Sequence, residues 1–99
     1  MEITDNPETR RYEARLGAEL AGILEYRLAG TRRILVHTEV LPAFEGRGVG
    51  GALARHALEA ARTAGTRVSV KCPFVRSWLE RHPQYDDLVI ASPRTPPGA

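Results

Sequence analysis

A cluster of glycines constrains this chain more than any other feature. Glycines stand at positions 46, 48, 50 and 51, directly after a run of β-type residues and directly before an alanine-rich helical pattern. Glycine lets backbone N–H groups converge without a Cβ atom in the way, and a helix N-terminus attracts negative charge. The cluster therefore predicts either a loop that binds an anion, such as a phosphate or pyrophosphate, or a tight strand-to-helix turn without a ligand.

Two common phosphate-binding loops do not fit the glycine cluster. A Walker A loop ends in Gly-Lys-Ser/Thr, whereas here the glycines run into Gly51-Ala52-Leu53. The dinucleotide-binding pattern G-x-G-x-x-G is satisfied, but the acidic residue expected about 20 positions later falls in Thr66-Arg67-Val68. The chain is also too short for the doubly wound sheet that this pattern requires, so both alternatives are excluded.

Length and composition indicate one small domain. The chain has 99 residues, of which 42% are hydrophobic, enough for a single core. Three prolines fall within residues 92–99. We therefore expect a single domain over residues 1–91 and a disordered tail over residues 92–99.

The charges favour an ordinary solvated surface. The 14 basic residues, of which Lys71 is the one lysine, stand against 12 acidic residues and give a net charge of +2. No basic stripe interleaved with aromatic residues is visible, which does not favour nucleic acid as a partner. The single cysteine excludes an internal disulfide, and no apolar stretch approaches the about 20 residues that a membrane helix needs. We expect a cytoplasmic protein without a membrane partner.

Hydrophobic periodicity predicts an α+β fold. An antiparallel meander of three strands leads to the glycine cluster, a long helix follows, and the chain returns in a strand parallel to the third one. This arrangement is one βαβ crossover. For residues 1–9 the sequence predicts either a loose arm or a short edge strand. The predicted strands cover residues 11–16, 19–28, 33–40, 67–72 and 88–90, and the two helices cover residues 49–64, capped by Gly65, and 74–82.

The glycine loop and several later motifs resemble one known superfamily. Val40-Leu41-Pro42 followed by Glu45-Gly46-Arg47-Gly48-Val49-Gly50 is similar to the acetyl-coenzyme A loop of the GNAT superfamily of N-acetyltransferases, whose pattern is Gln/Arg-x-x-Gly-x-Gly/Ala. Glu45 departs from that pattern. The stretches 37–40, 72–75 and 80–89 resemble a minimal GNAT-like family, and the resemblance spans about residues 5 to 90.

This resemblance implies a reduced GNAT fold in which the strands before and after the long helix splay apart and hold the pantetheine arm of coenzyme A (CoA). It implies acetyl-CoA as co-substrate and an amine as acceptor, without identifying the acceptor. A non-catalytic module that binds CoA or acyl-CoA is the alternative. The implied cofactor-binding residues are Thr38, Val40, Glu45, Gly46, Arg47, Gly48, Val49 and Gly50.

Three residues are candidates for the chemistry. Cys72 would lie near the thioester, where its thiolate could accept the acetyl group, or it is a small core residue. His37 would face this site and deprotonate the thiol or the acceptor amine, or it is an interior histidine bonded to the backbone. Tyr85 would protonate the departing CoA thiolate, or it anchors the turn at Pro83. The histidines lack metal-ligand spacing, so no metal site is expected.

Overall fold

The computed structural model describes residues 1–90, so the predicted tail, residues 92–99, lies outside the described part. Within residues 1–90 the chain forms five strands, two α-helices and two short 3-10 helices. In chain order they are β1 (Glu2–Asn6), β2 (Arg11–Leu16), β3 (Glu19–Ala29), β4 (Arg32–Val40), η1 (Pro42–Phe44), α1 (Val49–Ala64), β5 (Val68–Val70), α2 (Pro73–Glu80) and η2 (Pro83–Leu88).

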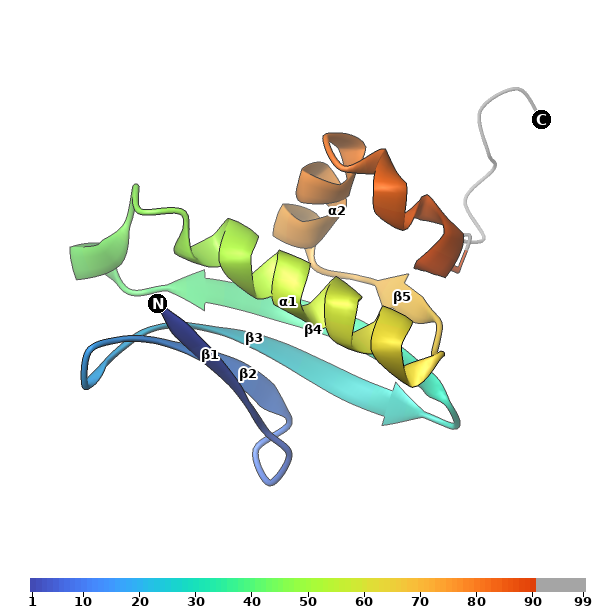
Figure 1. Cartoon of the computed structure of the whole chain (residues 1–99), viewed down its shortest axis with the longest axis horizontal. Coiled ribbons are helices and arrows are strands. Elements are labelled where there is room, and N and C mark those ends of the chain that lie inside the picture. Colours follow the sequence, from blue (N-terminus) through green and yellow to red (C-terminus); the bar gives the residue numbers. More distant parts are fainter. Residues whose placement is uncertain (91–99) are drawn as a thin grey trace.

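The strands form one mixed sheet in the order β1-β2-β3-β4-β5. The first four strands run antiparallel to their neighbours, and β5 lies parallel to β4 after the crossover through α1 (Figure 1). The structure confirms the predicted α+β fold with a meander, one βαβ crossover and two helices. The first nine residues supply the edge strand β1.

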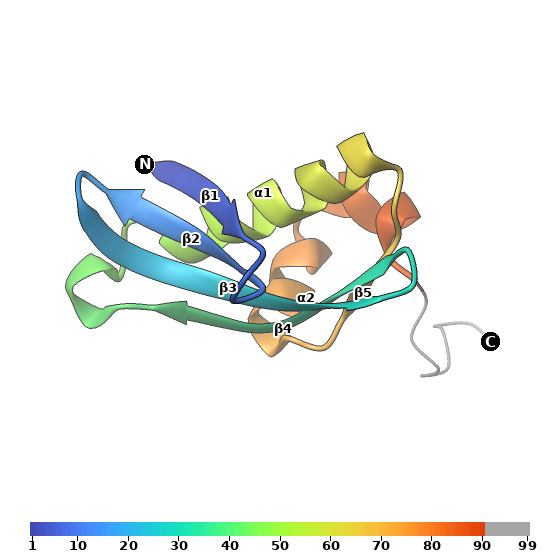
Figure 2. The same cartoon turned by 90° about the horizontal axis from the view of Figure 1, so that it is seen from below.

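The core lies between α1 and one face of the sheet. Leu53, Ala57 and Ala61 recur at helical spacing along α1, are buried, and pack in one cluster with Leu24 of β3 and Leu35 of β4. We call this side of the sheet the helix face. Figure 2 looks onto the opposite side, which we call the outer face, and shows both helices behind the strands. None of the helices within residues 1–90 covers the outer face.

Two glycines set the ends of α1. Gly48 before the helix has φ 76° and Gly65 after it has φ 71°, both in the left-handed region that glycine adopts without strain. The amide of Gly65 bonds the carbonyls of Ala61 and Arg62, as a C-terminal cap should. The predicted bounds of this helix, residues 49–64, and its predicted cap are confirmed.

Two predicted strands are wrong in extent or type. β5 covers only Val68–Val70, because the amides of Lys71 and Cys72 both bond the carbonyl of Leu35 and end the ladder there. The predicted last strand over residues 88–90 is not a strand. Leu88 ends η2, and Val89 makes only an isolated parallel bridge to Val68. The short apolar run gave no means of telling these alternatives apart.

Candidate functional site

A gap opens between β4 and β5 at the middle of the sheet. The parallel pairing of the two strands ends at Leu35 and Val70, whereas β4 continues to Val40. One edge of the second half of β4 therefore has no neighbouring strand within the described residues. This divergence is the splay that the sequence resemblance implied.

A β-bulge lies at the same level of the sheet as the start of the gap. On β3, Glu25 pairs with His37 and the next residue, Tyr26, pairs with Leu35, so Val36 is the extra residue on β4. A bulge shifts the alternation of the strand that carries it by one residue. Leu35 bonds toward β5 before the bulge, and the amide of Leu41 bonds Ala21 of β3 after it.

Alternation back from Leu41 shows which main-chain groups face the gap. The N–H and C=O groups of one strand residue point to the same side, and neighbouring residues point to opposite sides. Since Leu41 bonds β3, Glu39 and His37 also point toward β3, whereas Thr38 and Val40 present their N–H and C=O groups to the gap. Thr38 and Val40 are the two β4 residues that the sequence predicted to bind the cofactor.

The glycine loop leads from this gap to the N-terminus of α1. Gly48 caps the helix with no side-chain hydrogen bond, and the first turn of α1 contains no acidic residue. The first N–H groups of a helix have no partner inside the helix, so those of residues 49–51 are free to bind a ligand. A Cβ atom added at Gly46 or Gly48 would meet nothing within 4 Å, so the loop is open at these two glycines.

A hollow of about 210 Å³ lies over the loop and the first turn of α1. Six of the predicted cofactor-binding residues line it, and Phe44, Gly51 and Phe74 complete the wall. The six are Val40, Glu45, Gly46, Gly48, Val49 and Gly50. Arg47 lies beside the hollow, with its guanidinium carbon 5.7 Å from the centre of the Phe44 ring. Free N–H groups and a hollow at a helix N-terminus suit an anionic group of a ligand.

Sequence reasoning did not identify Phe74 as part of this site. Phe74 is 42% exposed at the second position of α2, and its ring would clash at 2.7 Å with a Cβ atom on Gly50. The glycine at position 50 therefore lets the ring cover the first turn of α1. An apolar residue directly after Cys72-Pro73 was the available signal, but only the packing of α2 on α1 places it in the hollow.

Cys72 lies at the gap between the strands. It is 2% exposed, precedes α2 as its N-cap residue, and its sulfur lies 3.2 Å from the hydroxyl oxygen of Thr38. Thr38 therefore joins the β4 side of the gap to the segment between β5 and α2. Lys71 is exposed whereas Cys72 is buried, so the lysine ammonium does not accompany the sulfur.

His37 does not face Cys72. It is exposed, it pairs across the strands with exposed Glu25, and its Nε2 atom lies 3.4 Å from a carboxylate oxygen of Glu39. Because Thr38, the next residue, contacts the sulfur, His37 points to the outer face. The structure thus does not assemble the Cys72–His37 pair that the sequence suggested.

Tyr85 faces α1 rather than the gap. Its hydroxyl donates a hydrogen bond of 2.5 Å to Glu59 and accepts one of 3.3 Å from Arg55. Its ring stacks on Trp78 with centroids 5.7 Å apart. The hydrogen bond to Glu59, together with burial, raises the pKa of Tyr85. These contacts are those expected of a tyrosine that anchors η2.

Fold and site together define a small protein of the GNAT class. A family model of the GCN5-related N-acetyl-transferases matches residues 11–88, and the chain belongs to this family. A search of curated proteins found no match.

Solved structures support the fold. The chain is similar to a GCN5-like protein from Staphylococcus aureus, with 21% identity, a TM-score of 0.72, and coverage of 99% of this chain and 96% of that one. It is also similar to an IAA acetyltransferase from Bacillus cereus, with 21% identity and a TM-score of 0.57, covering 74% of this chain. A third similar structure, a ribosomal-protein-alanine N-acetyltransferase from Brucella melitensis biovar Abortus, has 16% identity and a TM-score of 0.56, covering 87% of this chain. The chain spans 54% and 66% of the length of the last two proteins.

No group of three or more histidine, cysteine, aspartate or glutamate side chains within residues 1–90 is placed to hold a metal ion. No helix in that part of the chain is long and apolar enough to cross a membrane.

Proposed function

We propose that this protein transfers an acetyl group from acetyl-CoA to an amine. The observation that carries the proposal is that two features meet at Val40. The first is the gap beside Thr38 and Val40, and the second is the hollow over the glycine loop, which Val40 also lines. A long ligand with an anionic end fits both features at once. Membership of the N-acetyl-transferase family supports acetyl-CoA as that ligand.

In this proposal the chain holds CoA with main-chain groups. The pyrophosphate accepts hydrogen bonds from the N–H groups between Glu45 and Gly50, and Arg47 offsets the charge of Glu45. The pantetheine amides bond Thr38 and Val40 in the manner of an added strand. The thioester then lies near Cys72, which ends the opposite side of the gap.

The bound acetyl-CoA supplies an acyl group activated as a thioester. In the route through Cys72, its thiolate attacks the acetyl carbonyl, the carbon–sulfur bond to CoA breaks, and the CoA thiolate takes a proton. The acceptor amine then attacks the acetyl-cysteine, the bond between the acetyl carbon and the sulfur breaks, and Cys72 leaves as the thiolate. His37, on the outer face beside Glu39, accepts the proton that the amine loses. In the direct route the amine attacks the CoA thioester itself.

A non-catalytic CoA-binding module is the second candidate. The observation that favours it is the separation of His37 from Cys72, which leaves the buried sulfur with Thr38 as its side-chain hydrogen-bond partner within residues 1–90. Such a module would bind CoA through the same loop. It would release no CoA thiol when acetyl-CoA and an amine are supplied.

The test compares two alanine variants with the same backbone cost. Gly48 and Gly65 both have left-handed φ angles and open space around them, so each alanine substitution costs about 1–2 kcal/mol of folding stability. Of these two glycines, Gly48 lines the hollow and Gly65 does not. We expect Gly48→Ala to weaken CoA binding by about tenfold or more, whereas Gly65→Ala leaves it unchanged.

The measurements are calorimetric titration with CoA and release of CoA thiol from acetyl-CoA in the presence of amines. If the two variants bind CoA equally well, the pyrophosphate does not lie on this loop. If the parent protein binds acetyl-CoA saturably but acetylates no amine, the protein is a non-catalytic CoA-binding module and the proposed acetyl transfer is wrong.

A further inference from the structure

A second hollow lies on the outer face of the sheet, beside the β4 bulge. Its volume is about 150 Å³, and six residues line it: Thr9, Arg10, Glu25, Tyr26, Arg27 and Val36. A cavity of about 150 Å³ holds a molecule of benzene size. The hollow is thus large enough for a small organic molecule or for the end of a larger one.

The position of this hollow relates it to the gap between β4 and β5. Val36 is the bulge residue, and it directly follows Leu35, at which the pairing with β5 ends. On the helix face this level of the sheet is filled by buried side chains, including Leu35, Val68 and Val75. The helix face is therefore closed by packed side chains at this level, whereas the outer face is hollowed.

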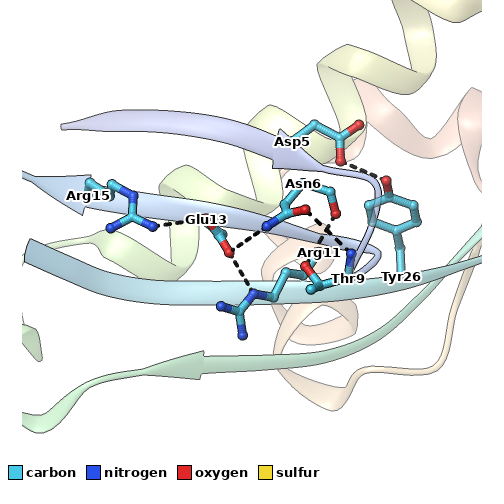
Figure 3. A network of polar contacts seen from close by, with 7 residues as sticks. All are labelled: Asp5, Asn6, Thr9, Arg11, Glu13, Arg15 and Tyr26. Atoms are coloured by element: carbon cyan, nitrogen blue, oxygen red, sulfur yellow. Dashed lines mark hydrogen bonds and ion pairs between the residues drawn. The ribbon is translucent and has the colours of Figure 1, made fainter.

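The turn that walls the hollow is tied down at several points. Asp5 accepts a hydrogen bond of 2.7 Å from the Tyr26 hydroxyl, and the carbonyl of Arg10 accepts one of 2.9 Å from the Tyr26 amide. Figure 3 shows how Asn6 bonds both Thr9 in the turn and the buried carboxylate of Glu13. The β1–β2 turn is therefore fixed beside Tyr26 of β3, and its residues Thr9 and Arg10 share the hollow with Val36.

Arg10 carries backbone strain at this wall. It is the one non-glycine residue within residues 1–90 with a positive φ, 56°. Such conformations persist where the surrounding structure imposes them, and they cluster at binding sites. At Arg10 the carbonyl bond to Tyr26 holds the strained residue at the rim of the hollow.

The charges of the hollow are free to bind a ligand. Arg10, Arg27 and Glu25 form no side-chain hydrogen bond or ion pair within residues 1–90, in contrast to Arg11 and Arg15, which both bond Glu13. Guanidinium groups match a carboxylate in charge and shape, and a carboxylate binds an ammonium group. The wall thus offers two positive groups and one negative group around a small volume.

We propose that this hollow binds the acceptor, and that the acceptor is a small amine that also carries a carboxylate. Arg27 and Arg10 bind the acceptor's carboxylate, and Glu25 holds its amino group near the start of the gap. This inference rests on the proposed acetyl transfer and adds the class of substrate. A zwitterionic amino acid neutralises one arginine and the glutamate at the same time.

The first arm of the test compares acids with their amides. Thiol release from acetyl-CoA is measured with glycine and β-alanine and with glycinamide and β-alaninamide. We expect kcat/KM to be at least about tenfold higher for the acids, and Arg27→Gln to remove that preference. Arg32→Gln is the matched control, because Arg32 is exposed at the far end of β4 and does not line the hollow. Amides that react as well as acids, with no effect of Arg27→Gln, would overturn the proposal while leaving acetyl transfer intact.

The second arm needs no turnover. The CoA-bound protein is titrated with β-alanine while the amide signals of Thr9, Arg27 and Val36 are followed by NMR. We expect saturable shifts in the parent protein and in Glu19→Gln, an exposed control, but shifts at much higher ligand concentration in Arg27→Gln and Glu25→Gln. If these shifts occur but no amine is acetylated, the proposed binding site is correct and the proposed acetyl transfer is wrong. Absence of the shifts overturns the site.

Discussion

At the scale of single residues, the contact between Cys72 and Thr38 is the most informative feature of the site. Thr38 lies on β4 beyond its pairing with β5, Cys72 lies two residues after the end of β5, and the two side chains meet at 3.2 Å on the helix face. A buried sulfur with a hydroxyl partner suits either a core residue or a nucleophile that a substrate reaches through the gap. Substitutions of Cys72 that change the nucleophile but keep the size of the side chain can decide between these roles.

We predict that Cys72→Ala keeps the affinity for CoA within a few-fold but lowers acetyl transfer by at least about tenfold. Cys72→Ser keeps the size and the hydroxyl partner but supplies a poorer nucleophile, so it should be equally impaired. Thr38→Val, which removes only the partner, should retain more activity than either. Full activity in the serine variant would assign Cys72 to packing and favour direct transfer.

His37 shows where sequence reasoning stops at this scale. Simple alternation from buried Leu35 would place His37 on the helix face and Thr38 on the outer face, and the sequence prediction of a Cys72–His37 pair depends on that placement. The extra residue Val36 reverses these placements, so His37 lies on the outer face and Thr38 on the helix face. Nothing in the local sequence marks a bulge here, because no glycine or proline interrupts β4.

At the scale of elements, β4 joins the two halves of the site. Its first half is a central strand between β3 and β5, and its second half has one free edge. The glycine loop, α1 and its cap were predictable, because glycine pattern and helical periodicity are local signals. The length of β5 was not, because it is set by the long-range bonds of Lys71 and Cys72 to Leu35.

The free edge of β4 predicts a pattern of amide exchange. If pantetheine bonds this edge, the amides of Thr38 and Val40 should exchange more slowly when CoA is added. The amide of Glu39, which already points toward β3, should change little and is an internal control. Hydrogen exchange followed by NMR with and without CoA measures this. Equal exchange rates at Thr38 and Val40 in both conditions would contradict pantetheine binding along β4.

At the scale of the whole molecule, the outer face has no covering helix within residues 1–90 and carries a network of charged side chains. Glu13 is 6% exposed on this face, and Arg11, Arg15 and Asn6 all donate hydrogen bonds to its carboxylate (Figure 3). The hydrogen bond from Arg11 is the main cause that lowers the pKa of Glu13 from its ordinary value of 4.5, although burial alone would raise it. The network stabilises the pairing of β1 with β2.

This network predicts how the stability depends on pH. Because the pKa of Glu13 is lower in the folded state, its contribution is present above 4.5 and disappears as the pH falls through the folded value. Glu13→Gln should therefore lower the free energy of unfolding by about 1–3 kcal/mol at neutral pH. The difference from the parent protein should shrink in acid.

Urea unfolding at neutral pH and at several values below 4.5 measures this difference. Glu19→Gln, at an exposed position at the start of β3, is the control and should match the parent protein throughout. A stability difference for Glu13→Gln that stays constant with pH would show that the carboxylate charge is not what matters.

The uncovered outer face also bears on the kinetics of the proposed reaction. In many enzymes a lid must close over the substrates and open again before the product leaves, and this motion limits the rate. Within residues 1–90 no helix lies over the hollow beside Val36, and the turn that walls it is fixed by hydrogen bonds. An acceptor and its acetylated product could therefore exchange with solvent without any rearrangement of the fold. In the proposed reaction, departure of CoA from the gap and from the hollow over the glycine loop would then be the slower physical step.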